Sequence, residues 1–404
     1  MATSFLIIIY LAFISLGLPD SLLGTAWPVM QPDLDAPLAA AGLLYMVIAG
    51  STIVSSLASG AMLNRFGTGK VALASCLLTA CALLGFSVSP SLAWLVVCAI
   101  PLGLGAGSVD AGLNNYVAAH YRAHHMSWLH CFWGVGATLG PMIMSGYISR
   151  EGDWRDGYLT VACLQFALVV VLLFALPLWD RVAKGSHAAA DGDSSADAGD
   201  PEQTEARSTR PLRIGGVKLA LLAFLFYCGV EATAGLWGSS YLVDEKGLSA
   251  STAARWVSLY YAGITAGRFL AGFLTFKVSN RTMIRGGQAA ALAGAALLVL
   301  PLPAGFSLAG LIVLGLGLAP IFPCMLHETP VRFGKTHAQT IMGYQMAVAY
   351  TGSTCLPPLL GYAASHTTIG IFPFYMAACA AAMLLVSERL NVFLAKKRTT
   401  ASKL

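Results

Sequence analysis

The sequence predicts an all-α membrane protein with about twelve transmembrane helices in two related, pseudo-symmetric halves of six. Three observations carry this prediction: an apolar composition, repeated stretches of about 20 apolar residues, and an internal repeat. The 404 residues are 57% hydrophobic and only 11% charged, whereas soluble chains carry about 25% charged residues. Since this charged fraction is too small to cover the surface of a soluble protein, we expect the lipid bilayer to surround most of the chain.

Apolar stretches separated by short polar breaks place six helices in each half. The expected helices are at about 4–30, 37–61, 70–88, 91–117, 127–148 and 157–179, then at 215–242, 251–276, 282–301, 307–327, 338–363 and 369–393. Between the halves, the chain contains too few apolar residues to offset the entropy of ordering. The predicted domains are an N-terminal bundle (1–180), a flexible cytoplasmic linker (181–213), a C-terminal bundle (214–394) and a cytoplasmic tail (395–404).

The distribution of Lys and Arg predicts the orientation, because cytoplasmic loops of membrane proteins are enriched in these residues. With the N-terminus inside, 19 of the 24 fall on the cytoplasmic side, four fall outside and one lies within a helix. We therefore expect a multi-pass protein of the bacterial inner membrane with both termini in the cytoplasm. The basic residues form no single patch, so nucleic acid is not an expected partner.

The internal repeat becomes visible when the second half is aligned with the first at an offset of about 211 or 212 residues. This offset places Asp20 on Glu231, and each acid is followed four residues later by a glycine, Gly24 or Gly235. A shared offset for several unusual features is typical of a parallel structural repeat.

Five ionisable residues lie inside the predicted membrane helices: Asp20, Asp110, His130, Glu231 and Arg268. Such groups are costly in lipid unless they are functional or paired. Burial penalises the charged form of a carboxylate, so the three acids are candidates for proton coupling. Arg268 requires an anionic partner or a water-filled passage; the sequence does not identify the partner, and a structural ion pair is favoured.

Helical spacing places further polar and aromatic side chains beside these groups. Trp27 shares a face with Asp20, Asn114 lies one turn from Asp110, and Trp133 lies three residues after His130. The candidate solute-binding residues are Asp20, Trp27, Asp110, Asn114, Asn115, His130, Trp133, Glu231, Trp237, Tyr241 and Gln345. For His130, a packing role is an equally good interpretation. Gln345 and the tyrosines are alternatively interpreted as residues that line the helix bundle.

The loop Gly60–Lys70, which includes Arg65, resembles the G-x-x-x-[DN]-R-x-G signature of the major facilitator superfamily. Strings that resemble its fucose permease-like branch of proton-coupled sugar symporters are Gly17–Asp20, Asp110 with Asn114, Tyr227–Glu231, Gly267–Arg268 and Gly317–Pro323. The resemblance covers nearly the whole chain and implies the major facilitator fold. It also implies that Asp20 and Asp110 serve proton coupling and sugar recognition. We expect Arg65 and Arg268 to act in gating.

The predicted function is proton-coupled uptake of a sugar or similar small polar solute by alternating access, carried out by a monomer. Two alternatives stay open: proton-coupled efflux of drugs or metabolites, which Trp27, Trp133 and Trp237 favour, and a non-transporting membrane receptor. An enzyme is not expected, because no nucleophile–base pair recurs at a membrane interface. Neither a cofactor nor a metal is expected, since the nine cysteines show no C-x-x-C spacing.

Overall fold

The computed structural model describes residues 2–120, 123–149, 153–190 and 211–401. Within this part the regular structure is entirely helical. The helices of the first half are α1 (Ala2–Asp20), α2 (Leu22–Asp33), α3 (Ala40–Phe66), α4 (Thr68–Ser87), α5 (Leu92–His120), α6 (Ala123–Ile148) and α7 (Trp154–Ala190). Those of the second half are α8 (Val217–Asp244), α9 (Ala250–Leu274), α10 (Asn280–Val299), α11 (Ala304–Leu318), α12 (Ile321–Phe333), α13 (Lys335–His366) and α14 (Phe372–Ala401), with short 3-10 turns η3 (Pro211–Arg213) and η4 (Ile369–Ile371).

Two of the twelve predicted helices are interrupted. The first is divided into α1 and α2 at Ser21, directly after Pro19 and Asp20, and the tenth is divided into α11 and α12 around Pro320. Proline removes a backbone donor and loosens the hydrogen-bond ladder of a helix. The other ten are continuous, so the described chain forms the expected twelve helical segments.

Nine helical spans in the described residues are long and apolar enough to cross a membrane. The long helices α6, α9 and α13 are not among them, and each carries several polar side chains. Together with the continuous helices, these spans confirm the predicted all-α membrane fold. The more polar helices are therefore the first places to look for a functional site.

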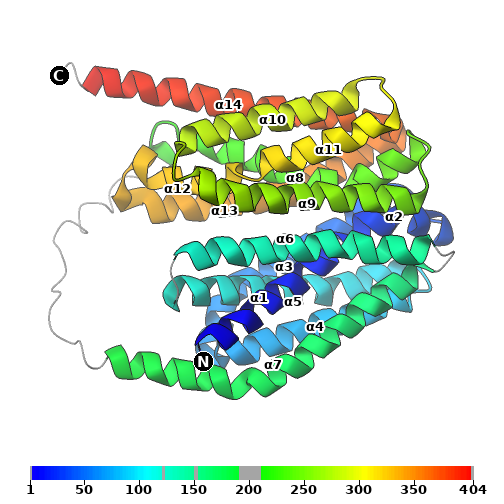
Figure 1. Ribbon diagram of the computed structural model, residues 1–404, viewed down its shortest axis with the longest axis horizontal. Helices are drawn as coiled ribbons and strands as arrows, with labels where there is room; N and C mark the ends of the chain where they lie inside the picture. The colour runs from blue at the N-terminus through cyan, green and yellow to red at the C-terminus, as the bar shows by residue number, and fades with distance from the viewer. Residues whose placement is uncertain (1, 121–122, 150–152, 191–210, 402–404) are drawn as a thin grey trace. The chain divides into compact units, whose positions relative to one another are not determined.

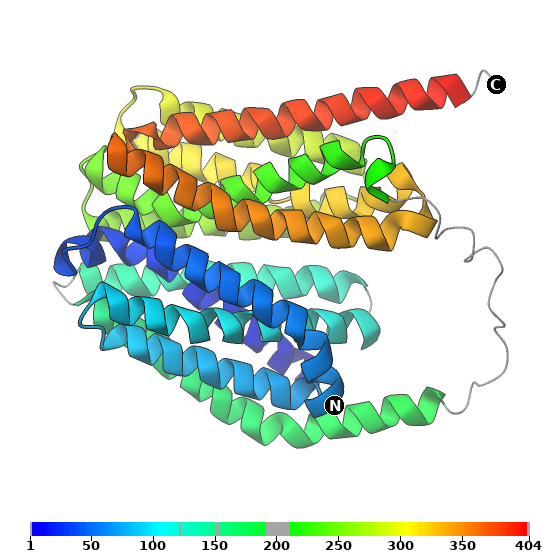
Figure 2. The ribbon, with the colours of Figure 1, turned by 180° about the vertical axis from the view of Figure 1, so that it is seen from behind.

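The chain divides into two compact units by its backbone contacts. Unit 1 comprises the described residues of 1–194, 235–265 and 358–370, and unit 2 comprises those of 195–234, 266–357 and 371–404. In unit 1, α5 packs between α3 and α4, α4 also packs on α7, and α1 packs on α6 and α7 (Figures 1 and 2). A Cβ atom on Gly103 of α5 would lie 2.1 Å from the Ile48 carbonyl oxygen of α3, so this pair requires glycine for its close approach.

A charged cluster joins the ends of three segments in unit 1. Arg155, at the start of α7, donates from Nη1 to Asp33 of α2 at 2.8 Å and contacts Asp153 at 3.1 Å. Its Nε and Nη2 donate to the Ser89 carbonyl oxygen at 3.0 and 2.8 Å, and the guanidinium lies 4.2 Å from the ring centre of Trp154. Arg155 therefore links the start of α7 to the end of α2 and to the segment between α4 and α5. The sequence predicts that this side of the membrane is external.

In unit 2, α10 packs against α11, α12 and α14 (Figure 1). A Cβ atom on Gly294 of α10 would lie 2.5 Å from the Leu314 amide nitrogen of α11, which explains the small residue there. A fork-shaped ion pair between Arg285 of α10 and Glu388 of α14 also links these helices, with two nitrogens donating to two carboxylate oxygens. Helix pairing here thus combines close backbone contact with a charged bridge.

Two helices extend beyond their predicted ends. α7 continues to Ala190, ten residues into the predicted linker, and α14 continues to Ala401, into the predicted tail. Both extensions contain alanine and lysine, which favour helix even where the apolar pattern ends. Residues 191–210 of the predicted linker lie outside the described residues. The predicted domain boundaries stay predictions.

Candidate functional site

The candidate site in unit 1 is built around Asp20, the last residue of α1. Asp20 is exposed to solvent in this conformation, although the surrounding helices desolvate its carboxylate, and Oδ2 accepts a hydrogen bond of 2.8 Å from the Trp133 indole nitrogen of α6. Trp133 also meets Tyr261 of α9 edge to face, with ring centres 6.5 Å apart. An acid, an indole and a phenol from three helices therefore adjoin one another.

A second carboxylate lies within electrostatic range of the first. Asp110 of α5 repels the charge of Asp20 and accepts a hydrogen bond of 2.8 Å from the amide nitrogen of Asn114, one turn further along the same helix. Both side chains are half-buried. The structure thus brings together two acids that are 90 residues apart in the sequence, as their residue numbers show. The side chain of Asn115 lies outside the described residues.

The other aromatic candidates in unit 1 are packing residues in this structure. Trp27 is fully buried, and its indole nitrogen has no hydrogen-bond partner among the described residues. Trp237 is also fully buried, and a Cβ atom on Gly361 would lie 2.4 Å from its ring. Tyr241 is buried beside the Lys246 ammonium, 5.8 Å from its ring centre. None of these three rings presents a surface to a solute in this conformation.

His130 and Arg65 lie at less buried positions. The His130 ring is half-buried and meets Phe13 of α1 edge to face, with ring centres 6.0 Å apart. Arg65 is exposed in the last turn of α3, with its guanidinium 5.4 Å from the ring centre of Phe66. His130 is therefore held by aromatic packing in the same unit as Asp20, and a gating role for Arg65 stays a prediction.

In unit 2, the structure identifies the partner of Arg268. Its Nη2 lies 3.2 Å from Oε1 of Glu231, which joins α9 to α8 in the described residues. The side chains are 15% and 17% exposed, so the pair is largely buried. The sequence identifies no partner for Arg268. In the structure its partner is Glu231, one of the predicted proton-coupling acids.

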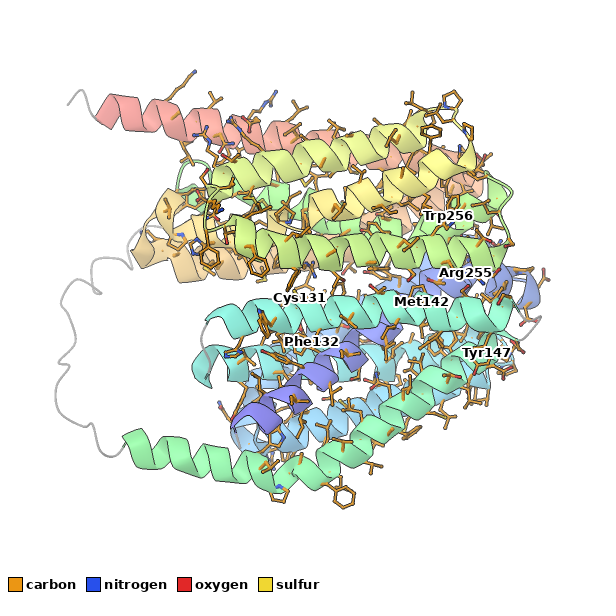
Figure 3. All side chains as sticks on the ribbon, viewed as in Figure 1. Cys131, Phe132, Met142, Tyr147, Arg255 and Trp256 are labelled. Carbon is orange, nitrogen blue, oxygen red and sulfur yellow. The ribbon has the colours of Figure 1, made fainter. Side chains whose placement is uncertain are left out.

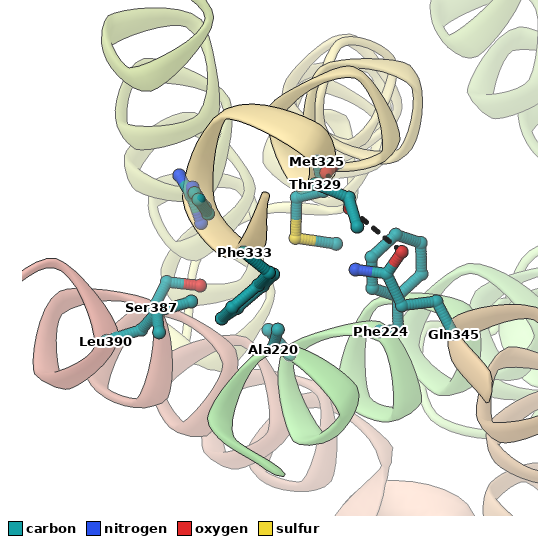
Figure 4. Close-up of a pocket in the computed structure, with 10 residues that line it drawn as sticks. Ala220, Phe224, Met325, Thr329, Phe333, Gln345, Ser387 and Leu390 are labelled. Carbon is teal, nitrogen blue, oxygen red and sulfur yellow. Dashed lines mark hydrogen bonds between the residues drawn. The ribbon is translucent and has the colours of Figure 1, made fainter. Parts of the chain in front are cut away.

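Gln345 of α13 lies in a small pocket of unit 2 (Figure 4). Its amide oxygen accepts a hydrogen bond of 3.0 Å from the Thr329 hydroxyl of α12, and its side chain is 1% exposed. Further lining comes from Phe224 of α8 and from Arg332 of α12, which contacts Glu328 at 3.3 Å. This pocket holds Gln345 in a satisfied hydrogen bond rather than presenting it openly.

A polar seam between α6 and α9 in unit 1 was missed by sequence reasoning. Ser145 donates to the Ser251 carbonyl oxygen, and Ser258 donates to the Thr138 carbonyl oxygen, each at 2.8 Å. Arg255 of α9 lies beside α6 (Figure 3) and donates from Nε to the Ser145 hydroxyl at 3.1 Å. Arg255 and Ser258, three residues apart, share one face of α9, and this spacing is the signal in the sequence that could have identified the seam.

Among the described residues, no group of three or more His, Cys, Asp or Glu side chains is placed to hold a metal ion. The fold and the intramembrane polar groups together define a multi-pass, all-helical membrane protein. The sequence profile of the Major Facilitator Superfamily matches residues 9–357 and, in a second match, 219–403. The chain therefore belongs to the Major Facilitator Superfamily.

Several known proteins are similar to this chain. "Bypass of stop codon protein 6" of Saccharomyces cerevisiae is 24% identical over 277 residues, which cover 65% of this chain and 55% of the yeast protein. The glucose/mannose transporter GlcP of Bacillus subtilis is 24% identical over 291 residues, covering 69% of each chain. A crystal structure of a D-xylose–proton symporter superposes with a TM-score of 0.72 at 14% identity and covers 97% of this chain and 98% of the symporter. At that identity the superposition shows a shared fold.

Proposed function

We propose that this protein is a secondary transporter that takes up a sugar or similar small polar solute together with a proton, by alternating access between two six-helix halves. The observation that carries the proposal is the exposed carboxylate of Asp20, held by the Trp133 indole at 2.8 Å and lying within range of a second acid, Asp110. Membership in the superfamily and the similarity to a glucose/mannose transporter support it. The bacterial inner membrane, cytoplasmic termini, a monomeric state and the fucose permease-like branch belong to the same proposal.

The site chemistry suits a solute that carries hydroxyl groups. The Asp20 and Asp110 carboxylates accept hydrogen bonds, and the Asn114 amide and Trp133 indole donate them. Two nearby carboxylates repel each other when both are charged, and a proton on either one removes that repulsion. Proton binding and solute binding therefore act on the same group of side chains.

The available energy is sufficient for accumulation. One proton that moves down the membrane potential releases about 2.3 kcal/mol per 100 mV, and about 1.4 kcal/mol corresponds to a tenfold concentration ratio. One proton per neutral solute therefore supports more than tenfold accumulation at a potential of about 100 mV.

The proposal is tested by uptake of labelled sugars into proteoliposomes under an imposed pH gradient. Asp110→Asn should abolish gradient-driven accumulation and retain solute exchange without a gradient, because the amide still forms hydrogen bonds and does not carry the proton. Asp35→Asn is the matched control: Asp35 is exposed at a turn with a φ of 47°, which asparagine also tolerates. Unchanged accumulation in Asp110→Asn would remove this acid from the coupling role.

A second candidate function, proton-coupled efflux of a drug or metabolite, is favoured by the aromatic contact between Trp133 and Tyr261 beside the Asp20 carboxylate. Aromatic faces attract apolar rings and cations. Thermal unfolding in detergent distinguishes the two: sugars stabilise the protein under the first function, and lipophilic cations under the second. Sugar binding without exchange in liposomes would instead indicate a receptor.

A further inference from the structure

Two acids that the internal repeat relates to each other are balanced differently. In unit 2, Glu231 of α8 lies 3.2 Å from the Arg268 guanidinium, so a fixed cation compensates its charge. Asp20 occupies the equivalent position in the first half. Its Oδ2 accepts a hydrogen bond from the neutral Trp133 indole, and among the described residues Asp20 forms no ion pair with Lys or Arg. The structure therefore leaves the charge of Asp20 without a fixed counter-charge.

The repeat shows where the first half differs from the second. Gly60 corresponds to Gly272, and Arg268 lies four residues before Gly272. The residue four positions before Gly60 is Ser56 of α3, whose hydroxyl donates to the Gly107 carbonyl oxygen at 3.2 Å. The first half thus carries a small neutral residue at the position where the second half carries its intramembrane arginine.

In the sequence of α1 to α7, Lys and Arg occur only at the ends of the apolar spans or outside them. Arg65 lies in the last turn of α3, Lys70 and Arg155 lie in the first turns of α4 and α7, and the others are outside the spans. The surrounding helices also desolvate the Asp20 carboxylate. Because a charge at membrane depth is costly unless it is compensated, Asp20 needs either a proton or a cation that arrives with the solute.

The groups around Asp20 suit an organic ammonium group that carries hydroxyls. The Trp133 ring meets Tyr261 edge to face, with ring centres 6.5 Å apart, and aromatic faces attract cations, that of tryptophan most strongly. Within electrostatic range lies Asp110, which accepts a hydrogen bond from Asn114. The site therefore combines a carboxylate and aromatic rings for a cation with further polar groups for hydroxyls.

We propose that the transported solute is a polyhydroxylated amine, such as an amino sugar, whose ammonium group forms an ion pair with Asp20 while Asp110 carries the coupling proton. The inference rests on the proposed function, because it assigns the class of solute to the same proton-coupled site. A proton from solvent bonds to a carboxylate oxygen of Asp110, and the ammonium group keeps all of its own protons. The loaded site then has no net charge. On release, the proton returns to water and the ammonium group leaves Asp20.

The charge of the solute changes the driving force for uptake. A neutral sugar that enters with one proton moves one positive charge, so a potential of about 100 mV supports about 40-fold accumulation. An ammonium solute that enters with one proton moves two positive charges, so the same potential supports accumulation of more than about a thousandfold. The membrane potential therefore separates a cationic solute from a neutral one.

The first experiment uses two matched labelled pairs that differ in the ammonium group: glucosamine with N-acetylglucosamine, and glucamine with sorbitol. Proteoliposomes receive a pH gradient, with or without a potassium diffusion potential that is negative inside. The wild type should take up an amine at least about tenfold faster than its neutral partner, and the potential should raise accumulation of the amine more. Uptake of neutral members alone would overturn the inference and leave the proposed function standing; accumulation of no member under either condition would overturn both.

The second experiment assigns the ion pair to Asp20. Asp20→Asn keeps an oxygen that accepts the Trp133 hydrogen bond but removes the negative charge, so the preference for the amine should fall about tenfold or more. The control variant Asp35→Asn, at an exposed turn, should keep the wild-type preference. Thermal unfolding in detergent gives a readout without transport: the amine should stabilise the wild type more than its neutral partner does, and this difference should disappear in Asp20→Asn. An amine preference that persists in Asp20→Asn would overturn the inference.

Discussion

The contact between α2 and α8 inside unit 1 provides a sharp test of the packing. A Cβ atom on Gly24 would lie 2.3 Å from the Gly235 carbonyl oxygen and 2.6 Å from the Leu236 Cα atom. Both are backbone atoms, so no side chain can rotate away to make room. At Gly50 of α3, by contrast, no described atom lies within 4 Å of an added Cβ atom.

Alanine substitutions at these two glycines therefore form a matched pair of variants. Gly24→Ala and Gly50→Ala each gain helix propensity, about 0.5–1 kcal/mol. Gly24→Ala must in addition separate two helix backbones, and overpacking of this kind costs about 1–3 kcal/mol. We expect Gly24→Ala to be less stable than Gly50→Ala by about that overpacking cost.

Thermal unfolding of both purified variants in detergent measures this difference directly. Gly24→Ala should unfold at a lower temperature than the wild type, and Gly50→Ala at the same or a higher temperature. Uptake into proteoliposomes should also fall in Gly24→Ala, because the substitution disfavours the conformation in which α2 and α8 touch. Equal unfolding temperatures for the two variants would refute the close contact.

Three further predictions follow from individual hydrogen bonds. Arg155→Gln removes the ion pair with Asp33 and should lower stability by about 1–2 kcal/mol, and this loss should shrink when thermal unfolding is repeated at high salt. Thr329→Val leaves the buried Gln345 amide oxygen without its donor and should cost about 1–3 kcal/mol in the same assay; no change would contradict the hydrogen bond. Trp133→Phe keeps an aromatic side chain but removes the indole donor at the site, and uptake should fall about tenfold, whereas wild-type rates would show that the donor has no role.

The sequence predicts the helical membrane architecture because lipid imposes strong local rules. Each span needs about 20 apolar residues and must satisfy its backbone hydrogen bonds internally. The same rules make an intramembrane acid conspicuous, so Asp20, Asp110 and Glu231 stand out in the sequence as candidates for function. The pairing of Asp110 with Asn114 is also a local matter, since residues four apart share a helix face.

These local rules do not predict which residues of different helices come into contact. The sequence aligns Gly24 with Gly235 as equivalent positions of a repeat, but it gives no sign that their backbones touch. It marks Arg268 as needing an anion without selecting Glu231, and it does not distinguish Trp27, which is buried, from Trp133, which meets the site.

The physical reason is that hydropathy reports the average surroundings of a helix and not the direction that each face takes. Between helices in lipid there is little hydrophobic driving force, and association depends on close packing and individual hydrogen bonds. Composition and periodicity therefore determined that this chain crosses a membrane many times with acids inside it. Tertiary packing alone decided which of those acids meets an indole, which meets an arginine, and where two helices come into backbone contact.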